Sequence, residues 1–260
     1  MTFELLTAAL EAKVDDLITK MNIDSDAIIV NQCSEDRKDE FTYQSHRIKV
    51  ISQTGRGVGL SRNTALSESK ADIVLFSDED IVYYEDYEAK VLKAFSDHPD
   101  AELITFNIKV DPRRKTYENT DVHRITWKNY GRYPAYAIAA RRDSLNKYNI
   151  RYSILFGGGA KYSNGEDSLF LHDCLKAGMI MYSETALLGE ETYRESTWFK
   201  GYTDKFFFDR GVLYHFLYGK ASYLLGIRFI FKNRKEMLKN RSFFNALGLL
   251  FKGIKEGKTV

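Results

Sequence analysis

The chain has 260 residues, 44% hydrophobic and 28% charged, so it is long enough to bury a substantial core, and its composition excludes a disordered or fibrous protein. The formal net charge of +2 is unevenly divided, because residues 211–260 carry a net charge of +8 and the remainder carries −6. Cys33 and Cys174 stand far apart without metal-ligand spacing, which favours reduced thiols over a disulfide framework or a zinc site.

Two features of the chain bear on its location. The first residues lack the basic and long apolar regions of a signal peptide. The most apolar late segment, residues 213–231, is interrupted by His215, Lys220 and Arg228 and makes a poor membrane span. We therefore expect a cytoplasmic protein, with peripheral contact at the inner face of the cell membrane as an option for its basic tail.

The chain begins with alternating strands and helices. Apolar runs predict strands at residues 3–9, 27–30 and 47–52, and an apolar stripe predicts a helix at residues 14–21. The second strand ends at Asn31 and Gln32. A strand, a helix and a second strand that follow one another at these short intervals are typical of a doubly wound α/β sheet.

A glycine turn and an acidic cluster follow. Gly55, Gly57 and Gly59 lead into a helix expected to begin near Leu60, and residues 73–76 form a continuous apolar run typical of a buried parallel strand. The turn lacks the third glycine of a dinucleotide fingerprint. The strand ends in Asp78-Glu79-Asp80, and ligands of open α/β sheets bind beyond the carboxyl ends of the strands.

Three consecutive carboxylates repel one another unless a cation lies among them. Mg²⁺ and Mn²⁺ prefer oxygen ligands, which makes Asp78 and Asp80 candidate metal ligands, whereas the alternative is a solvated acidic loop. Arg62 could either reach a diphosphate or lock the acidic loop with a bidentate pair. Asn63 could cap or pack the loop or contact the ligand.

The second half of the chain continues the alternation and adds two loops. Residues 85–95 and 167–177 predict helices, and residues 102–110, 135–140 and 179–186 predict strands. The polar and aromatic segment 111–132 has the character of a functional loop. Three glycines at 157–159 indicate close backbone approach or a moving flap.

Acidic and aromatic side chains around these elements are candidate site residues. Glu166 and Asp167 open a helix, where they could cap its N-terminus or act in catalysis. Tyr162 and Trp198 are candidate contacts for a sugar acceptor, although Trp198 could equally belong to the core.

The tail alternates apolar clusters with Lys and Arg between residues 206 and 251. Such helices lie on anionic membrane surfaces, where each basic residue contributes about 1 kcal/mol. The alternative is packing against the catalytic domain or a dimer partner. The acidic body of the protein argues against binding of nucleic acid.

Two of these motifs, in this order and at this spacing, resemble family 2 glycosyltransferases with the GT-A fold. They are Ser61-Arg62-Asn63 with the strand that ends in Asp78-Glu79-Asp80, and Gly165-Glu166-Asp167 at the start of a helix. The resemblance covers roughly residues 3–200, and residues 208–211 are similar to those of bacterial surface-polysaccharide members. Asn31-Gln32 replaces the family's Asp-Gly-Ser, and Tyr193-Arg194 stands where many relatives have a histidine that binds the metal, a place that Glu195 could take.

The resemblance implies a GT-A domain at residues 1–204, with a mostly parallel, doubly wound sheet and flanking helices, followed by a helical basic tail at 205–260. Within it, residues 1–110 would bind the nucleotide and 111–204 the acceptor. It further implies an inverting transfer from a nucleotide-sugar, expected to be a UDP-sugar, to a glycan or lipid-linked acceptor, with Mn²⁺ or Mg²⁺ as cofactor. Asp167 would be the catalytic base beside Glu166, and Asp80 with Asp78 would hold the metal. The donor-binding residues would be Asp78, Glu79, Asp80, Arg62, Asn63, Asn31 and Gln32.

Three other functions are compatible with parts of the sequence. A nucleotidyltransferase would need a glycine-rich basic loop at the first strand, and residues 6–11 contain no glycine and no basic residue. A non-catalytic glycosyltransferase-like assembly partner at the membrane would explain the altered Asn31-Gln32. A carbohydrate-binding module has no need of two acidic motifs at strand and helix ends.

Overall fold

The computed structural model describes residues 1–113, 115–192 and 201–260. The chain divides into two compact units, one of Met1–Ile154 with Glu166–Arg194 and the other of Leu155–Gly165 with Glu195–Val260. These units divide the chain at positions other than residue 204, and the expected division into two domains at that residue stays a prediction. No helix among the described residues is long and apolar enough to cross a membrane.

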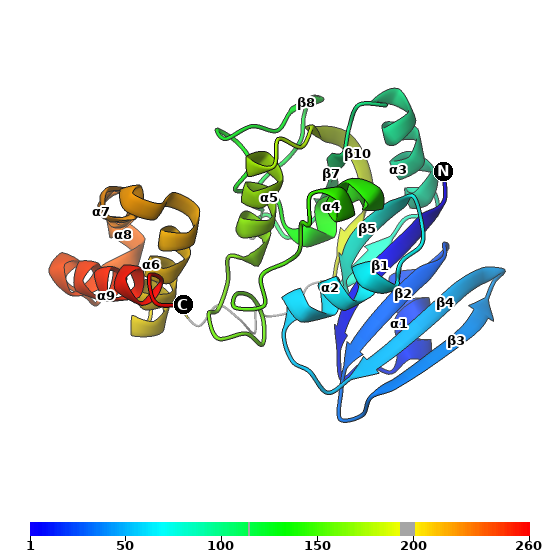
Figure 1. Cartoon of the computed structure of the whole chain (residues 1–260), viewed down its shortest axis with the longest axis horizontal. Coiled ribbons are helices and arrows are strands. Elements are labelled where there is room, and N and C mark those ends of the chain that lie inside the picture. The colour runs from blue at the N-terminus through cyan, green and yellow to red at the C-terminus, as the bar shows by residue number, and fades with distance from the viewer. Residues whose placement is uncertain (114, 193–200) are drawn as a thin grey trace. The chain divides into compact units, whose positions relative to one another are not determined.

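The first unit is built on one mixed, mostly parallel sheet (Figure 1). Its order in the described part of the chain is β3-β4-β2-β1-β5-β9-β7-β10-β6, with β8 paired to β10. Strands β4, β2, β1 and β5 are parallel, and β9 lies antiparallel between β5 and β7. The strands are β1 Phe3–Leu10, β2 Ala27–Gln32, β3 Arg37–Tyr43, β4 His46–Gln53, β5 Ile73–Asp78, β6 Ile81–Tyr83, β7 Leu103–Lys109, β8 His123–Arg124, β9 Ile138–Arg141 and β10 Met181–Glu191.

Helices cover both faces of this sheet (Figure 1). Helices α1 (Val14–Met21) and α3 (Tyr87–Asp97) pack with one apolar cluster, and α2 (Val58–Glu68), α4 (Arg142–Lys147) and α5 (Glu166–Lys176) pack with the other. Neighbouring residues of β1 alternate between the clusters, with Leu5 in the first and Leu6 in the second. The central strands are therefore apolar throughout because both faces are buried, as expected for a doubly wound sheet.

Several elements differ from the sequence expectations. The charged strand β3 was not expected, and it forms an antiparallel hairpin with β4 through Gln44 and Ser45, which both have positive φ. Residues 135–140 are not one strand, because Ala135–Ala137 forms a 3₁₀ helix before β9. The short elements β6 and α4 were also missed.

The second unit contains α6 (Asp204–Tyr218), a 3₁₀ turn (Gly219–Ala221), α7 (Ser222–Lys232), α8 (Arg234–Met237) and α9 (Phe243–Glu256). These helices share their own apolar cluster. Helices α6 and α9 approach closely at two glycines: a Cβ on Gly211 would lie 2.0 Å from the carbonyl oxygen of Leu250, and one on Gly253 would lie 1.9 Å from that of Phe208. Only glycine allows this backbone contact.

The loop 155–165 is fastened to these helices by two carboxylates. Asp209 accepts hydrogen bonds from the Ser163 amide at 2.9 Å, from the Ser163 hydroxyl and from Lys205 Nζ at 2.7 Å. Glu256 accepts from Lys161 Nζ at 2.9 Å and from the Tyr162 hydroxyl at 3.1 Å. Tyr162 is buried in this arrangement, and its contact with an acceptor stays a prediction.

Candidate active site

Three strands end together at one edge of the sheet. In the parallel register, Ala8 of β1 is paired with Asp78 of β5, and the next residues of β1, Ala9 and Leu10, are paired with Asn31 and Gln32 of β2. Side chains from three separate segments therefore meet at the carboxyl edge, where ligands of such sheets bind.

Arg62 joins the two acidic motifs. Its Nη2 donates to Asp78 Oδ1 at 2.8 Å, and its Nη1 donates to Asp167 Oδ1 at 3.1 Å and lies 3.7 Å from Glu166 Oε1. The side chain is only 3% exposed, and its guanidinium lies 5.0 Å from the ring centroid of Tyr152. Of the two roles left open for Arg62, the structure shows single hydrogen bonds to Asp78 and Asp167 in place of a bidentate pair, and a diphosphate contact stays a prediction.

Burial and charge set the protonation of Arg62 and Asp167. Burial acts to lower the pKa of Arg62, but the carboxylates of Asp78 and Asp167 outweigh it and raise that pKa, so the guanidinium stays charged. Burial raises the pKa of Asp167 to about 7, with Glu166 adding to the rise and Arg62 opposing it. The Asp167 side chain keeps 26% of its surface exposed. A hydroxyl group from solution can therefore reach this carboxyl group, whose pKa lies near neutral pH.

Helix α2 is docked by two small contacts that hold Arg62 in place. A Cβ on Gly59 would lie 2.3 Å from the carbonyl oxygen of Ser153. The side-chain amide of Asn63 donates from Nδ2 to the Tyr152 carbonyl oxygen, and its Oδ1 accepts from the backbone N–H of Tyr152, both at 2.8 Å. Asn63 thus packs the loop, and its predicted donor contact is untested. Sequence reasoning missed Tyr152, which lies in a segment without periodicity.

Tyr152 also connects α2 with α5, the helix that carries Asp167. Its ring stacks on Phe170 with centroids 4.1 Å apart and planes at 8°. Because Arg62 lies over the same ring, the positions of Arg62 and of the first turn of α5 are coupled through one aromatic side chain.

Asn31 and Gln32 hold neighbouring loops. The Asn31 amide pairs with the backbone of Ala12, at 3.0 Å to its N–H and 2.9 Å to its carbonyl oxygen. Gln32 Oε1 accepts from the Gly57 amide at 2.8 Å. Asn31 also lines a cavity of about 530 Å³, and other lining residues include Glu11, Cys33, Arg37, Asp39 and Phe41. A direct donor contact of Asn31 or Gln32 stays a prediction.

The acidic cluster offers oxygen ligands, but its members have different neighbours. Asp78 pairs with Arg62, Glu79 Oε2 accepts from the Leu10 amide at 3.0 Å, and the Asp80 carbonyl oxygen accepts from the Thr192 amide at 2.7 Å. Across residues 1–113, 115–192 and 201–260, no group of three or more His, Cys, Asp or Glu could hold a metal ion. Two carboxylates fit a hard cation whose other ligands are phosphate oxygens and water, which is the usual Mg²⁺ arrangement. Tyr193, Arg194, Glu195 and Trp198 lie outside the described residues.

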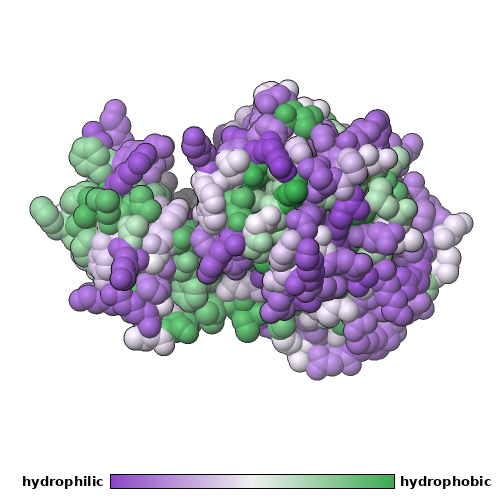
Figure 2. All heavy atoms as spheres, turned by 45° about the horizontal axis from the view of Figure 1, so that its top comes forward, coloured by the Kyte–Doolittle hydropathy of each residue, from purple (hydrophilic) through white to green (hydrophobic). Residues whose placement is uncertain are grey.

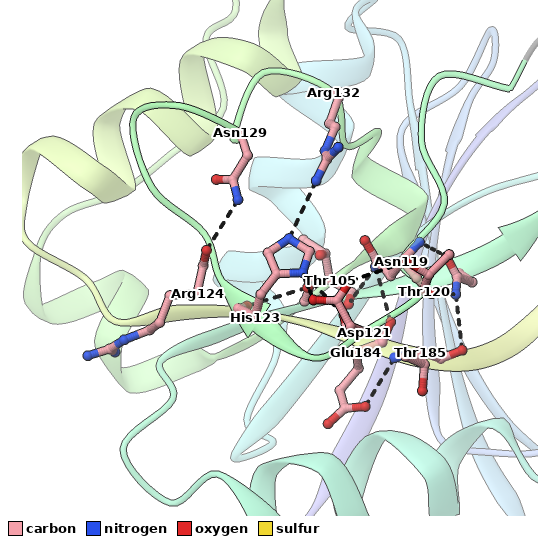
Figure 3. A network of polar contacts seen from close by, with 12 residues as sticks. Thr105, Asn119, Thr120, Asp121, His123, Arg124, Asn129, Arg132, Glu184 and Thr185 are labelled. Carbon is pink, nitrogen blue, oxygen red and sulfur yellow. Dashed lines mark hydrogen bonds and ion pairs between the residues drawn. The ribbon is translucent and has the colours of Figure 1, made fainter.

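The loop 111–132, expected to be functional, is pinned to the sheet by a polar network (Figure 3). Asn119 Nδ2 donates to the Glu184 carbonyl oxygen at 3.1 Å, and the Asn119 amide donates to Asn107 Oδ1 at 2.9 Å. His123 Nδ1 lies 2.8 Å from the Ser183 hydroxyl. These bonds fix the segment along β7 and β10.

Comparison with solved structures shows which fold this is. Residues 1–349 of TarS from S. aureus in complex with UDP-GlcNAc are 16% identical, with 98% of this chain and 82% of that chain covered and a TM-score of 0.64. The TarS complex with UDP is 17% identical over the same shares, with a TM-score of 0.62. The mannosyltransferase PcManGT from Pyrobaculum calidifontis in complex with GDP-Man and Mn²⁺ is 13% identical over 99% and 75% of the chains, with a TM-score of 0.50. At these identities the likeness shows the GT-A fold alone.

Comparison with protein families assigns the sequence itself. No curated protein matches the chain. The profile of "Glycosyl transferase family 2" matches residues 7–156, more than half of the chain, and this range contains Arg62 and the acidic strand end. The expected resemblance is confirmed: the chain belongs to glycosyl transferase family 2.

Proposed function

We propose that this glycosyltransferase is a metal-dependent inverting enzyme that moves a sugar from a UDP-sugar to a glycan or lipid-linked acceptor in bacterial surface-polysaccharide synthesis. The observation that carries the proposal is that the guanidinium of Arg62 donates one hydrogen bond to Asp78 and one to Asp167. A donor site at the strand end and a base at the helix start are thereby kept next to each other. The UDP and UDP-GlcNAc complexes of TarS support a UDP-sugar as the donor.

In this proposal Asp167 is the general base. It takes the proton from the acceptor hydroxyl while the hydroxyl oxygen bonds to the anomeric carbon, and the bond from that carbon to the diphosphate oxygen breaks on the opposite side. One displacement of this kind inverts the anomeric centre. The leaving diphosphate needs no protein acid, unlike the leaving group in glycoside hydrolysis. A pKa near 7 suits a base that works at neutral pH.

Asp80 and Asp78 are the residues that would hold Mn²⁺ or Mg²⁺. When bound, the cation neutralises the charge that develops on the departing diphosphate. Arg62 orients Asp78 at this edge, and Glu79 fixes the end of β1 through the Leu10 amide. The manganese complex of the mannosyltransferase supports the choice of cation.

The base is tested by comparing Asp167→Asn with Glu166→Gln. We expect Asp167→Asn to lower kcat by about 10²- to 10⁴-fold because the amide cannot accept the hydroxyl proton, with little change in donor affinity. Glu166→Gln, which lies further from Arg62, should retain most of the activity. Transfer assays with folding checked by circular dichroism measure both, and near-normal transfer by folded Asp167→Asn would rule out the assignment.

Thermal unfolding with nucleotides tests the donor and the metal. A ligand bound only by the native state raises the unfolding midpoint, so UDP should raise it more with Mn²⁺ than without, and more than GDP, dTDP or CDP. Asp80→Asn should remove the manganese-dependent part of the shift. A non-catalytic assembly partner, the alternative function, would show no metal-dependent shift with any nucleotide.

A further inference from the structure

Helix α7 carries large apolar side chains on its outer face as well as on its buried face. The buried face is formed by Ser222, Gly226 and Ile230, and a Cβ on Gly226 would lie 2.5 Å from Leu250 Cδ2. Large apolar residues lie on its outer face, where Leu224 is 70%, Ile227 39% and Phe231 59% exposed. A helix that only packed on its neighbours would carry polar residues at those three positions.

The three outward side chains form a continuous stripe. Residues three, four and seven apart lie on the same side of an α-helix, so Leu224, Ile227 and Phe231 are neighbours on the surface. Single exposed apolar residues are ordinary, but a contiguous group of them marks an interaction surface. Figure 2 shows hydrophobic residues beside hydrophilic ones on the surface of the helical second unit.

Positive charge surrounds this stripe. Arg228 and Lys232 are exposed on α7 itself, at helical spacing beside the apolar side chains. The other basic residues between positions 219 and 238 are Lys220, Arg234 and Lys235, and the only acidic residue there is Glu236. An apolar stripe flanked by cations is complementary to a surface that offers both acyl chains and anionic headgroups.

We propose that α7 docks on an anionic membrane surface. Leu224, Ile227 and Phe231 enter the boundary between headgroups and acyl chains, and Arg228 and Lys232 pair with lipid phosphates. The proposal goes beyond the proposed function, because it holds for any donor and any metal requirement.

Charge decides between a membrane and a second copy of the chain as the occupant. In a two-fold symmetric dimer the same patch meets itself, so Arg228 and Lys232 of each copy would approach the same cations of the other. Like charges brought together at an interface weaken it, whereas anionic lipid relieves their repulsion.

Sedimentation with phosphatidylcholine vesicles, with and without phosphatidylglycerol, tests the proposal on the full chain. We expect binding only to the anionic vesicles and weaker binding at high salt. Leu224→Ser with Phe231→Ser should weaken binding by at least about tenfold through lost apolar burial. Arg228→Glu with Lys232→Glu should weaken it by at least about tenfold through lost attraction to phosphate.

Matched variants on α9 provide the control. Lys252→Glu with Lys255→Glu makes the same change in net charge at two exposed residues, and Phe244→Ser removes a side chain that is 82% exposed. Both should bind vesicles nearly as the parent chain does. The proposal is overturned if the α9 variants lose binding as the α7 variants do, or if the chain ignores anionic vesicles. It is also overturned if Leu224→Ser with Phe231→Ser only converts a dimer to a monomer.

Discussion

Arg62 is a buried cation shared by the two acidic motifs of the candidate site. Removing one partner of such a pair leaves uncompensated charge, so we expect Arg62→Met to reduce the free energy of unfolding by about 3 kcal/mol. Arg56→Met is a suitable control, since the Arg56 pair with Glu11 is solvent-exposed and should contribute about 1 kcal/mol or less. Urea unfolding of the two variants measures the difference, and equal losses would show that the Arg62 pairs contribute no more than an exposed pair.

The raised pKa of Asp167 predicts a pH dependence of transfer. A base acts only when it is ionised, and burial favours the protonated form of Asp167, with a pKa of about 7. The specificity constant kcat/KM should therefore fall about tenfold for each pH unit below that pKa and level off above it. Glu166→Gln removes a neighbouring negative charge that contributes to the rise, so its profile should move to lower pH. An unchanged profile in Glu166→Gln would contradict this account of the shift.

At the residue scale, the sequence indicated candidate residues for the site but not the contacts that those residues make. The motifs around Arg62, Asp78 and Asp167 were recognisable because their order along the chain is informative. The contacts of Asn63 and Gly59 with residues 152–153 were not predictable, since they depend on a tertiary approach that leaves no periodic pattern.

The docking of α2 against residues 152–153 is the first prediction at the scale of elements. Gly59→Ala would place a methyl group against the Ser153 carbonyl oxygen, so the helix must shift, with an expected cost of about 1–3 kcal/mol and a loss of activity as Arg62 moves. Gly248→Ala in α9 is the control, because a Cβ there meets nothing within 4 Å and should be neutral or stabilising by about 1 kcal/mol. Thermal unfolding of both variants and transfer by Gly59→Ala are the measurements. Full stability and activity in Gly59→Ala would refute the close contact.

Elements were predictable where burial imposes a pattern and were missed where it does not. Strands β1, β2 and β5 are buried on both faces and read as apolar runs. Strand β3 is an exposed, charged edge strand whose pairing comes from the hairpin with β4, so its composition resembles that of a loop. The three residues of β6 are too few to show an alternation.

At the scale of the whole molecule, Asp209 connects helix α6 to the loop that precedes α5. Asp209→Asn keeps the size of the side chain but replaces one acceptor oxygen with a donor, and Ser163 and Lys205 both present donors. We expect a loss of about 2 kcal/mol in unfolding free energy and a lower kcat, since Glu166 follows Gly165 directly. Asp204→Asn is the control, since the Asp204 side chain is 73% exposed in its pair with Arg241, and it should change neither quantity by much. Wild-type activity and stability in Asp209→Asn would show that the hydrogen bonds of Asp209 to Ser163 and Lys205 are dispensable.

The attachment of the loop 155–165 to α6 and α9 has a consequence for biosynthesis. The loop is translated before α5 and β10, yet the carboxylates that hold it, Asp209 and Glu256, belong to α6 and α9. A nascent chain can therefore pair all the strands of its sheet while the segment leading to Asp167 still lacks its partners. We expect the enzyme to become active only after α9 has emerged from the ribosome, which would keep an incomplete chain from consuming nucleotide-sugar.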